Sequence, residues 1–270
     1  MASHSVPRTG RRRRRRRARR RVLLLAALCL TAGLAASVLS RRAAAPADSS
    51  LAAFSAQSVP TAAQAQALLA DPRMVLVNHT QSLPEGYTVT TKECGSSTAV
   101  NRTLQTEAAD AFLAMQAAAA KDGVTLWMQS GYRSADYQAG LYERKVQQFL
   151  DQGLSRADAE AQAATIVNPP GHSEHSTGLA ADLSCPEHTG LDEGFENTEA
   201  FRWLCAHAVQ YGFILRYPKA AEAVTEITYE PWHWRYVGPE NAALIHASGL
   251  CLEDAVAVLQ RLAAGQSMTG

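Results

Sequence analysis

The 270-residue sequence contains only five cysteines and no Cys-x-x-Cys pair. The missing pair argues against a thiolate zinc site. Cys29 lies in an apolar run, which leaves four cysteines in the rest of the chain: Cys94, Cys185, Cys205 and Cys251. Their even number suits an oxidising compartment, so one expectation is two disulfides, with Cys185 and Cys205 as the first candidate pair. Four buried free thiols are the alternative.

The first 42 residues contain no acidic residue. They hold 13 of the 26 lysines and arginines, so the rest of the chain carries 13 basic and 25 acidic residues, a formal charge of −12. An arginine run alone is typical of a nucleic-acid-binding tail, but the acidic body argues against nucleic acid as a partner. Because an apolar segment follows the arginines directly, we interpret residues 1–21 as a basic cytoplasmic head.

Residues 22–39 form an uncharged run of 18 residues, near the lower limit for a helix that spans a bilayer. The arginines before it favour a single-pass anchor in the cell membrane, with the rest of the chain outside the cytoplasm. The alternative is a signal peptide cleaved at the small-residue motif of residues 45–47, which would leave a secreted protein. Arg41 and Arg42 separate the run from this motif and favour the anchor. Residues 40–62, rich in Ala, Ser and Pro, are predicted to be a linker.

Residues 63–270 are predicted to form one folded domain without internal repeats. Hydrophobic periodicity and capping residues predict helices over residues 64–69, 106–121, 134–150, 155–167, 198–211, 239–247 and 252–263. Alternating or short apolar runs predict strands over residues 74–78, 124–130, 179–185, 213–217 and 232–238. Because strands and helices do not alternate regularly, the expected fold class is α+β, with a small antiparallel sheet flanked by helices.

Two residues with metal-binding side chains lie in the stretch GHSEHSTGLAAD, namely His175 and Asp182. They are seven positions apart, and an odd separation on one strand would direct them to opposite faces of a sheet. Both can face one ion only if His175 lies in the loop before the strand. Gly178 allows the necessary turn. This pair alone is equally consistent with a loop histidine that only makes hydrogen bonds.

The stretch EPWHWRYVG adds Glu230 and His233. A catalytic zinc ion requires about three N or O ligands and a nearby carboxylate that takes a proton from water. His175, Asp182 and His233 would be the ligands, and Glu230 would be the base. Glu230 and His233 would face apart on a regular strand, but Pro231 has no N–H and favours a strand start or bulge there. Such a break allows both side chains to enter one pocket.

A third stretch, SGYRSADYQ, places Arg133 just after a predicted strand. Its guanidinium could bind a carboxylate through two parallel hydrogen bonds. For an isolated arginine, a surface salt bridge is the alternative. His172 is interpreted as a solvated loop residue rather than a substrate contact.

Together, these three stretches resemble the signatures of VanY-type D-alanyl-D-alanine carboxypeptidases, which are zinc peptidases that share a fold with hedgehog proteins. The resemblance covers about residues 63–262. It implies that a Zn²⁺ ion is held by His175, Asp182 and His233 and that Glu230 is the general base. It also implies that the substrate's terminal carboxylate and peptide groups are held by Arg133, Gln138 and Ser173.

The activity that this resemblance implies is removal of the C-terminal D-alanine from peptidoglycan stem peptides. One alternative is an L,D-carboxypeptidase that acts on tetrapeptide stems, and another is a non-catalytic zinc-bearing module that binds the cell wall. The expected partners are a stem peptide and, through the N-terminal segment, the membrane. The protein is expected to be a monomer.

Overall fold

The computed structural model describes residues 59–94 and 101–266. A four-stranded antiparallel sheet has the strand order β3-β4-β6-β5. Its strands are β3 (Trp127–Ser130), β4 (Ala180–Ser184), β5 (Phe213–Tyr217) and β6 (Glu230–Tyr236). A second sheet is a pair of short antiparallel strands, β1 (Thr91–Glu93) and β2 (Thr103–Gln105). The α+β class with a small antiparallel sheet is therefore confirmed, whereas the predicted head and apolar segment lie outside the described residues.

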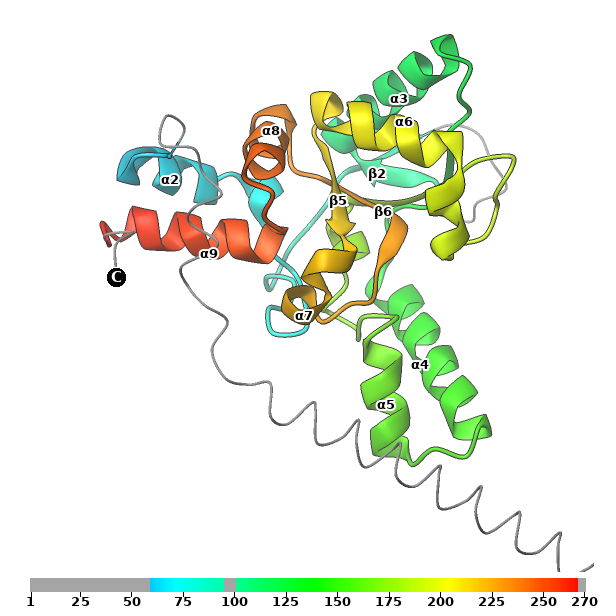
Figure 1. Ribbon diagram of the computed structural model, residues 1–270. Helices are drawn as coiled ribbons and strands as arrows, with labels where there is room; N and C mark the ends of the chain where they lie inside the picture. Colours follow the sequence, from blue (N-terminus) through cyan, green and yellow to red (C-terminus); the bar gives the residue numbers. More distant parts are fainter. Residues whose placement is uncertain (1–58, 95–100, 267–270) are drawn as a thin grey trace, which may run out of the picture. The chain divides into compact units, whose positions relative to one another are not determined.

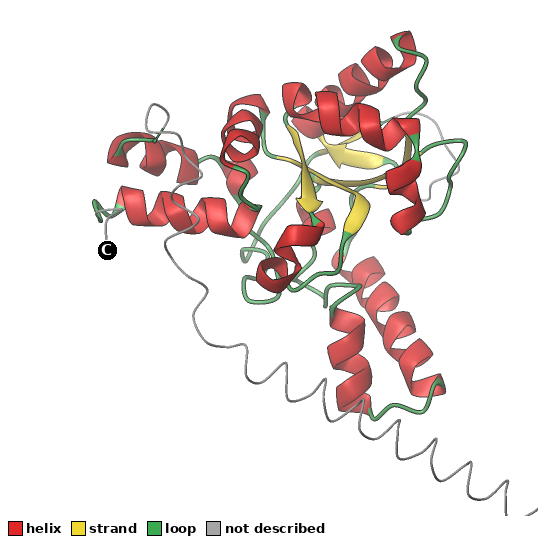
Figure 2. Ribbon diagram, in the orientation of Figure 1, coloured by secondary structure: helices red, strands yellow, loops and turns green. Residues whose placement is uncertain are grey.

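Helices surround these strands (Figures 1 and 2). They are α2 (Ala62–Leu69), α3 (Thr106–Lys121), α4 (Ala135–Asp151), α5 (Arg156–Ala164), α6 (Glu199–His207), α7 (Glu222–Thr225), α8 (Pro239–Ser248) and α9 (Leu252–Ala263). The predicted caps are present, since Ser134 and Ser155 accept hydrogen bonds from the first turns of α4 and α5. Among the described residues, no single helix is long and apolar enough to cross a membrane, and α8 with α9 meets that test only as a pair bent by 96°.

The four-stranded sheet separates two environments, because side chains alternate between its faces along each strand. Ala181 and Leu183 of β4 and Trp234 of β6 belong to the main hydrophobic core, together with residues of α3 and α6. The intervening Asp182 and His233 point to the opposite face, where they are also buried. One face of the sheet therefore packs against the hydrophobic core, and the opposite face carries the polar residues Asp182 and His233.

Two further clusters lie outside the main core. Residues of α2, α8 and α9 pack with Ile214 and Val237, and in Figure 1 these helices lie together near the C-terminus. Helices α4 and α5 pack against each other around Val146, Ala159 and Ala163. This helical pair matters for function because the first turn of α4 carries Gln138 toward the polar face of the sheet.

The strand predicted at residues 74–78 is wrong. Met74 ends a 3₁₀ turn that begins at Pro72, and the following residues have no regular structure. The carbonyl oxygens of Arg73 and Val75 accept hydrogen bonds of 2.9 and 2.8 Å from the guanidinium of Arg235, so a side chain takes the place of a neighbouring strand. Met74 and Val77 are still buried, and Val75 and Leu76 are partly buried, which explains why their sequence looks like a strand.

The expected disulfides are also wrong, including the pairing of Cys185 with Cys205. All four cysteines of the described residues are free thiols. Cys94 and Cys185 belong to the main core, and Cys251 is buried before α9, whereas Cys205 is exposed. The alternative of free thiols is confirmed, although only three of the four are buried.

Candidate active site

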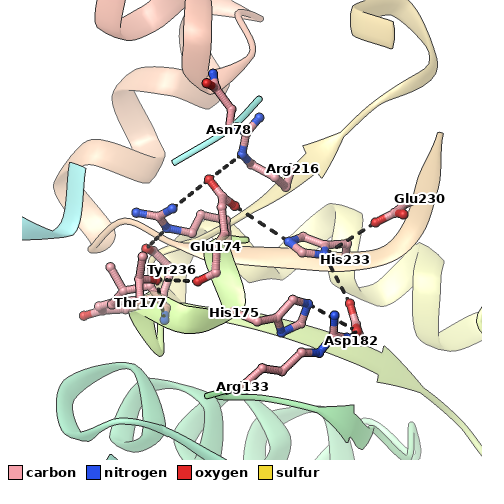
Figure 3. A network of polar contacts seen from close by, with 12 residues as sticks. Asn78, Arg133, Glu174, His175, Thr177, Asp182, Arg216, Glu230, His233 and Tyr236 are labelled. Carbon is pink, nitrogen blue, oxygen red and sulfur yellow. Dashed lines mark hydrogen bonds and ion pairs between the residues drawn. The ribbon is translucent and has the colours of Figure 1, made fainter. Parts of the chain in front are cut away.

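Three buried side chains that could hold a metal ion meet at the polar face of the sheet: His175, Asp182 and His233. One candidate ligand atom from each lies within 4.8 Å of the other two. Asp182 and His233 are direct partners on β4 and β6, so their side chains share one face. His175 comes from the 3₁₀ turn Glu174–Thr177 before β4, which is the loop position that the odd spacing required. Figure 3 shows the three side chains converging.

Two glycines allow the chain to close around His175. Gly178 ends the 3₁₀ turn with a φ of 74°, and a Cβ there would lie 3.0 Å from the backbone nitrogen of Gln105. At Gly131, a Cβ would lie only 2.2 Å from the carbonyl oxygen of Thr103. The Gly131 carbonyl in turn accepts a 2.8 Å hydrogen bond from His175 Nδ1. Because a carbonyl can only accept, the proton of His175 is on Nδ1 and the lone pair of Nε2 faces the site.

Glu230 reaches the same site because β6 is irregular at its start. Tyr217 of β5 pairs with Glu230 and Leu215 pairs with Trp234, so three residues of β6 oppose a single residue of β5. Pro231 lies in this irregularity, where the sequence predicted a break. As a result, Glu230 Oε2 lies 3.5 Å from His233 Nδ1, although the two residues are three positions apart on one strand.

The buried site shifts the pKa values of its groups in opposite directions. Burial raises the pKa of Glu230 to about 8, and it lowers the pKa of His175 to about 4. Burial also opposes the charged form of His233, but its contacts with the carboxylates of Asp182 and Glu174 outweigh this effect and raise the pKa of His233 to about 9. Desolvation is likewise outweighed at Asp182, where His175 and Arg133 hold the pKa well below its usual range. Without a metal, both His233 and Glu230 are therefore protonated near neutral pH, and His175 is neutral.

The residues predicted to bind substrate line a cavity of about 270 Å³ beside the candidate ligands. Arg133 donates a 2.9 Å hydrogen bond from Nε to Ser130 Oγ, and its Nη2 pairs with Asp182. Gln138 is fully buried and donates a 2.6 Å hydrogen bond to the Asn168 carbonyl, while its Oε1 has no partner among the described residues. The structure thus places these two side chains at the cavity together.

Ser173 also lines this cavity, directly before the 3₁₀ turn that carries His175. It is buried, and its hydroxyl does not cap the turn. His172 differs from the prediction, because its Nδ1 contacts the carbonyl oxygen of Asn78 at 2.7 Å and the side chain is partly buried. His172 thus contacts a second loop and is only partly exposed to solvent.

The sequence reasoning missed Glu174, whose side chain is fully buried beside the site. Its Oε1 accepts hydrogen bonds from Arg216 and Arg235, and its Oε2 lies 3.7 Å from His233 Nε2. Figure 3 shows the contacts of Glu174 with Arg216 and His233. A signal was present in the sequence, since both arginines interrupt apolar strands and a buried guanidinium requires a counter-charge. The sequence alone did not indicate which acidic residue would supply the counter-charge.

Comparisons with known proteins agree with this geometry. Residues 101–239 match the family model described as VanY, D-alanyl-D-alanine carboxypeptidase. A D-alanyl-D-alanine carboxypeptidase of Enterococcus faecalis (strain ATCC 700802 / V583) is 36% identical over 183 residues, which is 67% of this chain and 64% of the relative. The chain therefore spans slightly less than two thirds of the length of this curated relative.

Solved structures with the same fold include two of VanY proteins. VanYB in complex with D-alanine-D-alanine has a TM-score of 0.61 and 34% identity, covering 68% of this chain and 97% of that chain. A glutamate-to-alanine variant of the D,D-pentapeptidase VanY in complex with Zn(II) has a TM-score of 0.60 and 34% identity, covering 68% and 99%. The LD-carboxypeptidase LdcB has a TM-score of 0.58 and 36% identity, covering 69% and 87%.

Proposed function

This chain belongs to the VanY family of D-alanyl-D-alanine carboxypeptidases, and from that premise we propose that it is a zinc carboxypeptidase of the cell wall. Its reaction would remove the C-terminal D-alanine from peptidoglycan stem peptides. The observation that carries this proposal is the buried group of His175, Asp182 and His233 with Glu230 beside it. A merely structural metal site would have no need of that additional carboxylate in an open cavity.

The three proposed ligands fit a zinc ion. Atoms bound about 2.0–2.1 Å from a tetrahedral zinc ion lie roughly 3.3 Å from one another. Asp182 presents one carboxylate oxygen to each histidine, with His175 Nε2 3.3 Å from Oδ2 and His233 Nδ1 3.1 Å from Oδ1, and one candidate atom from each residue lies within 4.8 Å of the other two. Asp182 Oδ1 is buried and makes no hydrogen bond of good geometry with any described residue, so it is available to a metal. The relative in complex with Zn(II) supports the same choice of metal.

A zinc ion held by His175, Asp182 and His233 would supply activation of the attacking water and polarisation of the scissile carbonyl. Glu230 accepts the proton of the attacking water and then donates it to the amine of the leaving D-alanine. Glu230 is 7% exposed and lines the cavity, so its carboxylate can reach a substrate that binds there. Ser173 and Gln138 orient the peptide groups of the substrate from the wall of the cavity.

Arg133→Lys is expected to lower kcat/KM for a stem pentapeptide by about 10- to 100-fold, because lysine keeps the charge but loses the two parallel hydrogen bonds to the terminal carboxylate. The measurement is steady-state kinetics at saturating zinc, with the pentapeptide acid and its C-terminal amide compared. The wild type should strongly prefer the acid, and this preference should shrink in Arg133→Lys. Arg144→Lys, an exposed change on α4, serves as the control. An unchanged preference for the acid would remove Arg133 from the proposed role.

Zinc binding is expected to release between one and two protons per ion at pH 7. The pKa of His233 is raised to about 9 and that of Glu230 to about 8, so both carry a proton in the metal-free protein at pH 7, whereas zinc requires a neutral imidazole. Zinc affinity should therefore fall as the pH drops below about 9. Calorimetric titration in buffers of different ionisation enthalpy measures the protons directly. Release that does not diminish between pH 7 and pH 9.5 would contradict this expectation.

The direct test of the proposed function uses synthetic pentapeptide and tetrapeptide stems, each with and without a zinc chelator. Release of D-alanine from the pentapeptide that stops with chelator supports the D,D-carboxypeptidase. Exclusive release from the tetrapeptide would instead favour an L,D-carboxypeptidase, the alternative suggested by the likeness to LdcB. No release from either peptide, together with zinc binding, would favour a non-catalytic wall-binding module.

We also propose that the protein is held at the cell membrane, with residues 63–270 outside the cytoplasm. Support comes from the 18-residue apolar run that directly follows an arginine-rich segment. An intact N-terminus in the membrane fraction is the expected result. A secreted chain that begins near residue 48 would show that the segment is a cleaved signal peptide instead.

A further inference from the structure

Glu174 has an unusual environment for a carboxylate. Its side chain has no solvent exposure, and two arginines with equally buried side chains lie against it. Arg216 Nε and Arg235 Nη1 donate hydrogen bonds of 2.8 and 2.7 Å, and both donate to the same oxygen, Oε1. Neither guanidinium therefore satisfies the second oxygen, Oε2.

The second oxygen faces His233. Glu174 Oε2 and His233 Nε2 are 3.7 Å apart, and neither atom has a hydrogen-bond partner among the described residues. A buried polar atom without a partner costs free energy, and each of these two atoms is the group best placed to satisfy the other. A shift of well under 1 Å would close the gap to hydrogen-bonding distance.

The charges around Glu174 decide which atom carries the proton. Two guanidiniums keep the carboxylate ionised, so Glu174 can only accept a hydrogen bond. In the neutral ring that zinc binding requires, His233 must then hold its proton on Nε2, which leaves the lone pair of Nδ1 directed toward Asp182. Glu174 would thus accept a hydrogen bond from His233, as the Gly131 carbonyl does from His175. In His175 the proton is on Nδ1 and Nε2 faces the site.

We propose that Glu174 is a positioning residue that fixes the orientation and tautomer of His233 for zinc binding, an inference that rests on the proposed zinc carboxypeptidase function. Glu174 touches neither the substrate nor the reacting atoms in this assignment. Its influence passes through His233, since hydrogen-bonded partners of metal-binding histidines hold the ring and increase its basicity. The two arginines act one step further away, by holding the carboxylate in place.

The test compares Glu174→Gln with Glu253→Gln in the full-length protein. Both changes remove one negative charge from the buried network, because Glu253 pairs with Arg216 in two hydrogen bonds of 2.7 and 2.6 Å, but Glu253 does not contact His233. Zinc affinity is measured by competition with a chelator. Glu174→Gln is expected to weaken zinc binding by about 10- to 100-fold and Glu253→Gln by much less. Equal losses in the two variants would overturn the proposal, since they would reflect only the damaged arginine network.

A second measurement needs no variant. In the zinc-loaded wild type labelled with ¹⁵N-histidine, His233 is expected to carry its proton on Nε2 and to bind the metal through Nδ1. A proton on Nδ1 would overturn the proposal whatever the variants do, including the case in which Glu174→Gln fails to fold. Neither measurement depends on the carboxypeptidase assay. Wild-type protein that binds zinc but releases no D-alanine would refute the proposed activity. The role of Glu174 would still be decided by the zinc affinities of the variants and by the position of the His233 proton.

Discussion

Replacing Glu230 with alanine is expected to lower kcat for D-alanine release by about 100- to 10,000-fold while zinc remains bound. The loss is large because Glu230 is the carboxylate proposed to move the proton from water to the leaving amine. Zinc should remain because Glu230 is not one of the three proposed ligands, although its Oε2 lies 3.5 Å from His233 Nδ1. Removing a buried carboxylate also removes a competitor for that nitrogen, so zinc affinity should not fall.

The experiment for Glu230→Ala combines metal analysis with steady-state kinetics on a stem pentapeptide. Glu240→Ala is a suitable control because Glu240 is exposed in the first turn of α8. A variant with stoichiometric zinc and wild-type kcat would eliminate Glu230 as the base. Loss of zinc would instead identify Glu230 as a ligand and require a different proton acceptor.

The part of the site that could be predicted from sequence depends on short-range chain geometry. The odd spacing between His175 and Asp182 required a loop before the strand, and the structure places a 3₁₀ turn there. The proline after Glu230 indicated a break in regular pairing, and the register of β5 and β6 shifts at that point. In both cases the backbone rule operates over fewer than ten residues, so no knowledge of the rest of the fold was needed.

The features that escaped prediction depend on contacts between distant segments. Glu174 lies 42 positions from Arg216 and 61 positions from Arg235, and nothing local to any of the three residues indicates the pairing. The same network explains the wrong strand at residues 74–78, because Arg235 binds carbonyl groups of that segment. Arg235 thus contacts both Glu174 and the segment that was wrongly predicted to be a strand. An apolar run indicates burial, but it cannot show whether a strand or a side chain will bind its backbone.

His233→Ala is expected to weaken zinc binding by more than about 100-fold, which is the upper end of the loss caused by removing a supporting residue. The expectation follows from the geometry of β6. His233 lies directly opposite Asp182, and alanine leaves no donor atom at that position. D-alanine release should disappear with the metal, and saturating zinc should restore only a small part of it.

Competition with a chelator measures the zinc affinity of His233→Ala, with His246→Ala as the matched control. His246 is exposed on α8 and takes no part in the candidate metal group, so its removal should leave zinc affinity and activity unchanged. Comparison with Glu230→Ala then separates two kinds of inactive protein. One retains zinc and lacks the proton acceptor, whereas the other retains the acceptor and lacks the metal. If His233→Ala kept wild-type zinc affinity, the metal would have to bind elsewhere, and the proposed arrangement of ligands and base would be refuted.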